Sequence, residues 1–276
     1  MRNAIIELKK ELSGLADEER AEVSQRFFKT GKGEYGEGDV FIGLTVPQSR
    51  KIAIKFRSLS FADILKLLKS KIHEERLIAL LILVNRFDVG SEEEKKNIFD
   101  FYLKNAKCVN NWDLVDLSAD KIVGAYILGR GPVRSFPPAS ARSTSAHVRA
   151  VGSPSSSATP PILIKLAKSE NLWERRIAIV ATYYFIKNNK FGATLKIAEI
   201  LLNDKHDLIH KAVGWMLREV GKKDLKTEIG FLNKHYKQMP RTMLRYAIEK
   251  FPDRLRTGYL KFKIRSPLPV FGAEKR

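Results

Sequence analysis

Apolar residues return every three or four positions along almost the whole chain, and this pattern limits the fold more than any other feature of the sequence. The spacing is that of amphipathic helices, whereas the strict alternation of a half-buried strand is missing. We therefore expect an all-α protein. The predicted helices span residues 4–15, 48–57, 61–69, 74–87, 93–106, 113–128, 162–168, 172–187, 192–203, 207–220, 225–236 and 241–250.

Several residues indicate where these helices begin and end. Ser60 and Ser91 are typical N-caps, because a serine hydroxyl can accept from a free backbone N–H of the first turn. Pro240 suits a first helical turn, where no backbone N–H is needed. Gly90 and Gly221 follow apolar runs and are predicted to end helices.

Four of the predicted helices share one arrangement, with polar residues at the start and a small alanine inside an apolar stripe. A small side chain lets a neighbouring helix approach closely. Paired helices of this kind, roughly 35–45 residues apart, predict a curved α-solenoid of HEAT-like repeats. An irregular helical bundle is the alternative. The four alanines are Ala79, Ala178, Ala212 and Ala247.

The segment 129–160 differs from the rest of the chain. It holds eight Ser and five Pro but no Leu, Ile, Lys, Asp or Glu, so it cannot form a packed core. We expect a disordered insertion that interrupts a single HEAT-like domain spanning residues 1–261. A frame-shifted stretch of coding sequence would give the same change in composition. Residues 262–276 are predicted to be a loose C-terminal tail.

The charge balance points to a polyanionic partner. Lys and Arg number 50 against 31 Asp and Glu, a formal net charge of +19, which favours nucleic acid first and an anionic membrane surface second. No apolar run approaches the roughly 20 residues of a membrane span. Charged residues interrupt the apolar residues of the N-terminus, so we do not expect a signal peptide there. A single cysteine, Cys108, excludes an internal disulfide and any multi-cysteine metal site. We expect a cytoplasmic protein that is associated with the nucleoid when bound to DNA.

The most informative local sequence is NNWDLVDLSAD, residues 110–120. Trp112 and Asp116 are four positions apart, so a helix would place them on one face. A packing role for the indole beside a surface charge is the competing interpretation. A second candidate is NLWERRIA, residues 171–178, in which Trp173 and Arg176 are i and i+3. The adjacent side chains of Arg175 and Arg176 point in different directions from a helix, so at most one of them can join the concave face of the solenoid.

A third candidate is HKAVGWMLREVGKK, residues 210–223. Lys211, Trp215 and Arg218 fall at i, i+4 and i+7, which forms one basic stripe around an indole and suits contact with a nucleic-acid backbone. A core tryptophan flanked by cations that extend to solvent is the alternative.

Two other patterns are only weak indications of a binding site. His206 and His210 have metal-ligand spacing, but no HExxH motif or third ligand accompanies them, so we expect a surface pair and no metal site. The glycine-rich sequence GKGEYGEGD, residues 31–39, lacks the Lys-Ser/Thr of a phosphate-binding loop and is predicted to be a mobile turn.

Four segments together resemble the AlkD-type DNA alkylation repair glycosylases: VFIGLTVPQSRKIA (40–53), NNWDLVDLSAD (110–120), LWERRIAIV (172–180) and HKAVGWMLREVGK (210–222). Their order is that of the family, and the resemblance covers most of residues 20–260. It implies a curved stack of HEAT-like repeats whose basic concave face holds duplex DNA. It also implies excision of N3- and N7-alkylated purines without a metal or an organic cofactor. We expect a monomer.

The resemblance assigns roles to individual residues. Asp116 matches the catalytic carboxylate, and Trp112 and Trp215 match aromatics that contact the deoxyribose of the lesion. Arg176 matches an arginine that supports the site and the DNA backbone. The N-terminal aromatic of the family has no firm counterpart, and Phe27 or Phe28 is our candidate.

These residue types suit the chemistry. Alkylation at N3 or N7 places a positive charge on the purine, so the base is already a good leaving group. The sugar then needs a nearby anion and a positioned water, and one fixed carboxylate can supply both. Two alternatives stay open: a non-catalytic HEAT-repeat protein that binds branched or distorted DNA, and a HEAT-type scaffold for protein partners.

Overall fold

The computed structural model describes residues 4–129 and 159–261. The predicted insertion at 129–160, apart from its end residues Gly129, Thr159 and Pro160, lies outside the described residues, as does the predicted tail at 262–276. Within the described ranges no strand forms, and the only β-type pairing is an isolated bridge between Val40 and Ile72. None of the helices there has the length and apolar character that crossing a membrane requires.

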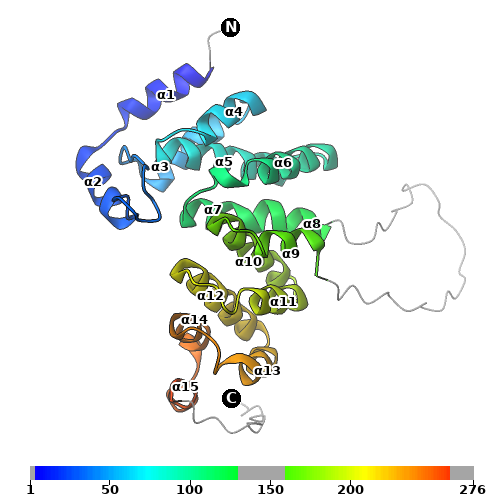
Figure 1. Cartoon of the computed structure of the whole chain (residues 1–276). Helices are drawn as coiled ribbons and strands as arrows, with labels where there is room; N and C mark the ends of the chain where they lie inside the picture. The colour runs from blue at the N-terminus through cyan, green and yellow to red at the C-terminus, as the bar shows by residue number, and fades with distance from the viewer. Residues whose placement is uncertain (1–3, 130–158, 262–276) are drawn as a thin grey trace, which may run out of the picture.

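The described chain is a succession of helices (Figure 1). Short 3-10 turns occur at Ala106–Cys108 and Ile248–Lys250, and a π-helical turn at Asp120–Gly124 joins α7 to α8. The α-helices are α1 (Ala4–Gly14), α2 (Glu18–Phe27), α3 (Val46–Lys55), α4 (Phe61–Leu68), α5 (His73–Val89), α6 (Glu92–Lys104), α7 (Trp112–Ala119), α8 (Ala125–Gly129), α9 (Pro161–Ala167), α10 (Leu172–Lys187), α11 (Gly192–Ile200), α12 (Asp207–Lys223), α13 (Leu225–His235), α14 (Arg241–Ala247) and α15 (Asp253–Leu260).

The helices pack as a repeat, not as an irregular bundle. One layer is formed by α3, α5, α7, α10, α12 and α14, and each of these helices packs on the next. The second layer contains α4, α6, α9, α11 and α13, which pack against the first layer. Figure 1 shows the resulting stack, which runs from α1 at the top to α15 at the bottom. The predicted all-α solenoid of HEAT-like repeats is confirmed.

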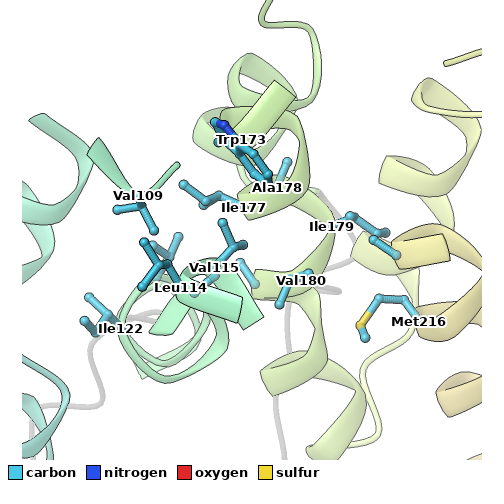
Figure 2. Close-up of a cluster of buried hydrophobic side chains, with 14 of the residues drawn as sticks. Val109, Leu114, Val115, Ile122, Trp173, Ile177, Ala178, Ile179, Val180 and Met216 are labelled. Carbon is cyan, nitrogen blue, oxygen red and sulfur yellow. The ribbon is translucent and has the colours of Figure 1, made fainter. Parts of the chain in front are cut away.

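Small residues let the helices of the first layer approach closely. Ala79, Ala178, Ala212 and Ala247 are all buried, as their position in the apolar stripes predicts. Gly214 of α12 serves the same purpose, because an added Cβ there would lie 2.4 Å from the carbonyl oxygen of Met243 in α14. Figure 2 shows part of the core that these contacts produce, in which α7, α10 and α12 contribute to one cluster of buried hydrophobic side chains.

The predicted helix ends are largely correct. The hydroxyls of Ser60 and Ser91 accept from the backbone N–H three residues later, and Gly90 follows the end of α5. Pro240 lies at the N-cap, one position before the first turn of α14. The prediction for Gly221 is wrong, since α12 continues to Lys223. This glycine instead leaves space for a buried side chain, because an added Cβ would lie 1.6 Å from Oε2 of Glu228.

Two helices, α2 and α15, were absent from the prediction. Helix α2 buries none of its residues, so its sequence has no apolar stripe to detect. Its start is fixed locally by Asp17, whose carboxylate accepts from the backbone N–H of Arg20 at 2.9 Å. Helix α15 is similarly polar and buries only Tyr259. Helix α2 ends at Phe27, one of the two candidates for the N-terminal aromatic.

Candidate active site

Helix α7 presents two of the predicted residues on one face. Asn111 caps the helix through its side chain, which accepts from the N–H of Trp112 at 2.8 Å. One turn later, Asp116 faces the same cleft as the indole of Trp112. The indole is half-buried and stacks on the ring of Phe28, with centroids 5.2 Å apart. The tryptophan and the carboxylate are therefore held at a fixed spacing.

Asp116 is bound by Arg176 of α10. The guanidinium donates from Nε to Oδ1 at 3.0 Å and from Nη2 to Oδ2 at 2.8 Å, a two-bond geometry that fixes the plane of the carboxylate. A third bond, from Nη1 to the carbonyl oxygen of Leu208 at 2.5 Å, anchors the arginine to α12. Burial raises the pKa of the Asp116 carboxyl, and Arg176 opposes this by favouring the ionised form.

Only one arginine of the adjacent pair reaches the cleft, as the helical geometry predicts. Arg176 is 4% exposed and lines the cleft with Asp116. Arg175 points elsewhere and pairs with Asp204, with Nε 2.6 Å from Oδ2. Trp173, one turn earlier, is buried in the core, so its role is packing.

Helix α12 supplies the basic stripe that the sequence predicts. Lys211, Trp215 and Arg218 all line the cleft. Both cations also have acidic partners: Nζ of Lys211 lies 2.7 Å from the carboxylate of Asp207, and Arg218 pairs with Glu249. Part of the positive charge is therefore already compensated before any anion binds.

These elements enclose an open cleft of about 670 Å³ between α2, α7, α10, α12 and α14. Its lining includes every candidate residue except Phe28, namely Phe27, Trp112, Asp116, Arg176, Lys211, Trp215 and Arg218. The parts of the site on α7, α10 and α12 are thus brought together by the stacking of the first helix layer, and Phe27 joins them from the end of α2.

The structure distinguishes the two N-terminal aromatic candidates. Phe27 is 63% exposed and lies at the cleft, in edge contact with the indole of Trp112 at 5.9 Å between centroids. Phe28 is partly buried behind it, stacked between Trp112 and Phe41. Phe27 is therefore open to the cleft, whereas Phe28 packs against the indole.

The glycine-rich segment 31–39 is part of the site, which the sequence did not predict. Tyr35 lines the cleft, and its hydroxyl accepts from Nε1 of Trp112 at 3.3 Å. Asp39, at the end of the segment, pairs with Arg76 of α5, with 2.6 Å between Oδ2 and Nη2. The segment is therefore tied to α7 through Tyr35 and to α5 through Asp39.

A buried histidine, His73 of α5, was also missed. Its Nε2 lies 2.8 Å from Oδ2 of Asp113 on α7, and its Nδ1 lies 3.4 Å from Oδ2 of Asp39. Burial opposes protonation of the ring, but the hydrogen bonds to the two carboxylates outweigh it and raise the pKa of His73. The ring therefore links α5 and the glycine-rich segment to the helix that carries Asp116.

The two histidines at the start of α12, the N-cap His206 and His210 in the first turns, have local partners. Nδ1 of His206 accepts from the backbone N–H of Leu208 at 3.2 Å, and Nε2 of His210 lies 2.5 Å from the carbonyl oxygen of Asp204. Across residues 4–129 and 159–261, no group of three or more His, Cys, Asp or Glu side chains is arranged to hold a metal ion.

The fold and the cleft define a HEAT-like repeat protein with a basic, aromatic cleft around a fixed carboxylate. The family model for the DNA alkylation repair enzymes matches residues 8–251, and the chain belongs to this family. No curated protein matches the chain.

Two solved structures share the fold. A "predicted DNA alkylation repair enzyme" from Enterococcus faecalis superposes with a TM-score of 0.61 at 15% identity, covering 86% of this chain and 97% of its own. AlkD2 from Streptococcus mutans superposes with a TM-score of 0.51 at 16% identity, covering 89% of this chain and 99% of its own. At such identities the likeness concerns the fold alone.

Proposed function

We propose that the protein is a DNA glycosylase that excises N3- and N7-alkylated purines from duplex DNA, with Asp116 as the catalytic carboxylate. The observation that carries this proposal is the pairing of Asp116 with Arg176 inside a cleft that also holds Trp112 and Trp215. Membership of the DNA alkylation repair family supports the class of substrate. We further propose that the protein acts as a monomer in the cytoplasm, on nucleoid DNA.

The arrangement suits hydrolysis of an N-glycosidic bond to a cationic base. As the bond breaks, positive charge develops on the deoxyribose, and a carboxylate held in place stabilises that charge without having to reorganise. Arg176 uses one lone-pair site on each oxygen of Asp116, so the remaining sites are available to position a water molecule. The glycosidic bond breaks with its electron pair passing to the cationic base, which leaves as a neutral alkylated purine. The positioned water bonds to the sugar carbon and gives its proton to the Asp116 carboxylate.

The aromatic side chains favour a damaged nucleotide over a normal one. An alkylated purine carries a positive charge, which is attracted to the electron-rich faces of indole rings. Trp112 is held by Tyr35 and Phe28, and Trp215 contacts Tyr183 at 5.8 Å between centroids. Both indoles are therefore already in contact with aromatic neighbours before DNA enters the cleft.

Release of 7-methylguanine or 3-methyladenine from methylated duplex DNA tests the proposal. Under single-turnover conditions we expect Asp116→Asn to bind DNA but to lose about 100-fold or more in excision rate, since a preorganised electrostatic group contributes several kcal/mol. Asp253→Asn is the matched control, because this aspartate also pairs with an arginine, Arg256, but lies on the surface.

The outcomes separate the three functions. Excision by the wild type and its loss in Asp116→Asn support the glycosylase. Tight binding of branched or distorted duplexes without base release would favour the non-catalytic DNA-binding protein. Absence of DNA binding would favour the protein scaffold and contradict the proposal.

A further inference from the structure

The Tyr35 hydroxyl keeps an unused hydrogen-bond donor beside the cleft. An indole N–H is a donor only, so in the contact between Nε1 of Trp112 and the Tyr35 hydroxyl, the hydroxyl must accept. The hydroxyl still carries its own proton, and no hydrogen bond among the described residues uses it. This proton must point away from Trp112. Burial raises the pKa of Tyr35 above its ordinary value, which keeps the hydroxyl protonated.

The segment that carries Tyr35 is fixed by its own short-range contacts. The carboxylates of Glu34 and Glu37 accept from the backbone N–H groups of Gly31 and Gly33 at 2.9 and 2.8 Å. Gly36 donates to the carbonyl oxygen of Lys29 at 3.1 Å. An added Cβ on Gly36 would lie 2.5 Å from the carbonyl oxygen of Phe28, so only glycine permits this approach. The tyrosine is thus placed in advance of ligand binding.

The tyrosine ring is held at a second point. It meets the indole of Trp173, a core residue of α10, edge-on at 6.3 Å between centroids. Tyr35 therefore bridges Trp112 on α7 and Trp173 on α10, the two helices that supply Asp116 and Arg176. A side chain that is fixed at both ring and hydroxyl loses little freedom when it binds a partner.

The surroundings of the hydroxyl favour an anionic acceptor. Lys29 and Lys211 line the same cleft. The positive charge of Lys211 acts on the Tyr35 hydroxyl more strongly than the negative charge of either nearby carboxylate, Asp113 or Glu34. The anions that DNA presents are its phosphates, and these receive half or more of the hydrogen bonds in protein–DNA interfaces.

We propose that Tyr35 is a positioning residue whose hydroxyl donates to a non-bridging phosphate oxygen of the lesion-bearing strand while it accepts from Trp112. This inference rests on the proposed function, in that it assumes duplex DNA in the cleft. Its consequence is that binding of one phosphate and orientation of the Trp112 indole depend on each other through a single oxygen atom.

A double-replacement cycle tests the assignment. Duplexes with one 7-methylguanine carry a single uncharged methylphosphonate, moved one position at a time along the lesion strand, and are titrated with wild type and Tyr35→Phe. On the natural backbone we expect Tyr35→Phe to raise the protein concentration at which half of the duplex is bound about tenfold. This is the effect of losing one hydrogen bond to a charged group. At one position, the methylphosphonate should weaken wild type about as much and leave Tyr35→Phe nearly unchanged.

Controls keep the test falsifiable. Tyr184→Phe removes a hydroxyl from a half-buried tyrosine of α10 that does not line the cleft, and it should bind every duplex as wild type does. Thermal melting checks that Tyr35→Phe is folded. Additive effects at every position overturn the assignment, as does wild-type binding by Tyr35→Phe. If wild type releases no base, the proposed function fails, but anisotropy titrations of the same duplexes still complete the cycle.

Discussion

Arg176 and Asp116, 60 residues apart in the chain, meet through two parallel hydrogen bonds of 3.0 and 2.8 Å that join α10 to α7. The carboxylate is 21% exposed on its cleft side, so it is bound from behind and open in front. Burial raises the pKa of the Asp116 carboxyl, and the guanidinium of Arg176 acts in the opposite direction. The pair thus fixes the plane of the carboxylate, and Arg176 favours its ionised form against the effect of burial.

The first prediction concerns this pair. Arg176→Lys keeps the positive charge but cannot supply two parallel bonds and a third to Leu208. We expect single-turnover excision at neutral pH to fall about tenfold, the value of one charge-assisted hydrogen bond. The pKa of Asp116, already raised by burial, should rise further, so activity on the acidic side should be lost at a higher pH than in wild type.

The neighbouring arginine provides the control for that measurement. Arg175→Lys makes the same change in a residue that pairs with Asp204 outside the cleft. Arg175→Lys should not shift the pH–rate profile relative to that of wild type. A profile that does not move in Arg176→Lys would mean that Asp116 is not the group whose ionisation sets the rate.

The second prediction concerns DNA binding. Neutralising a lysine that contacts a phosphate reduces the slope of log affinity against log salt by about one. We expect Lys211→Gln to do so and to weaken undamaged and damaged duplexes alike. Lys196→Gln is the control, since Lys196 lies on α11 of the second layer and, like Lys211, has an acidic partner on its own helix. Equal slopes in wild type and Lys211→Gln would remove Lys211 from the interface.

The residues that the sequence revealed are those with periodic positions on helices. Trp112 and Asp116 share a face because helix geometry places i and i+4 together. The stripe at Lys211, Trp215 and Arg218 follows from the same periodicity. For these residues, the periodicity of the helix was sufficient to predict which side chains share a face. The stacking of the repeats then places both helices at one cleft.

The residues that the sequence did not reveal depend on long-range contacts. Tyr35 lies in a segment without periodicity, and its position is set by Gly36 and by contacts with two tryptophans far along the chain. His73 opens an apolar helix, where a polar residue is expected simply to start the first turn. Its carboxylate partners, Asp39 and Asp113, lie 34 and 40 positions away, and no local pattern predicts such pairing.

The third prediction concerns His73 and pH. The folded-state pKa of His73 is raised above the ordinary 6.5, so its contribution to stability is fully present below about pH 6.5 and is lost as pH rises through the folded value. The free energy of unfolding of wild type, minus that of His73→Gln, should therefore decrease above pH 6.5. The groups that face the ring are Asp39, Asp113, Arg76, Phe28 and Phe41.

Urea unfolding at a series of pH values measures this difference. His206→Gln is a control of opposite sign, because burial lowers the pKa of His206 and its protonation opposes folding as pH falls below 6.5. Parallel curves for wild type and His73→Gln would show that the ring does not change its protonation on folding.

The last prediction concerns Glu228, which is 1% exposed against Gly221 of α12. Burial raises the pKa of Glu228 to about 9, although Arg218 favours the ionised form. In the unfolded chain this carboxyl ionises near its ordinary value of 4.5, so it destabilises the fold progressively as pH rises from 4.5 to about 9. Glu228→Gln has nearly the same shape and cannot ionise. Its stability relative to wild type should therefore increase over that interval, by at most about 1.4 kcal/mol per pH unit, and stay level above it.

The exposed Glu22 of α2 supplies the control variant, Glu22→Gln, for which we expect no such trend. Urea unfolding at pH 5, 7 and 9 decides the matter, and a constant difference between Glu228→Gln and wild type would show that Glu228 is ionised in the folded protein.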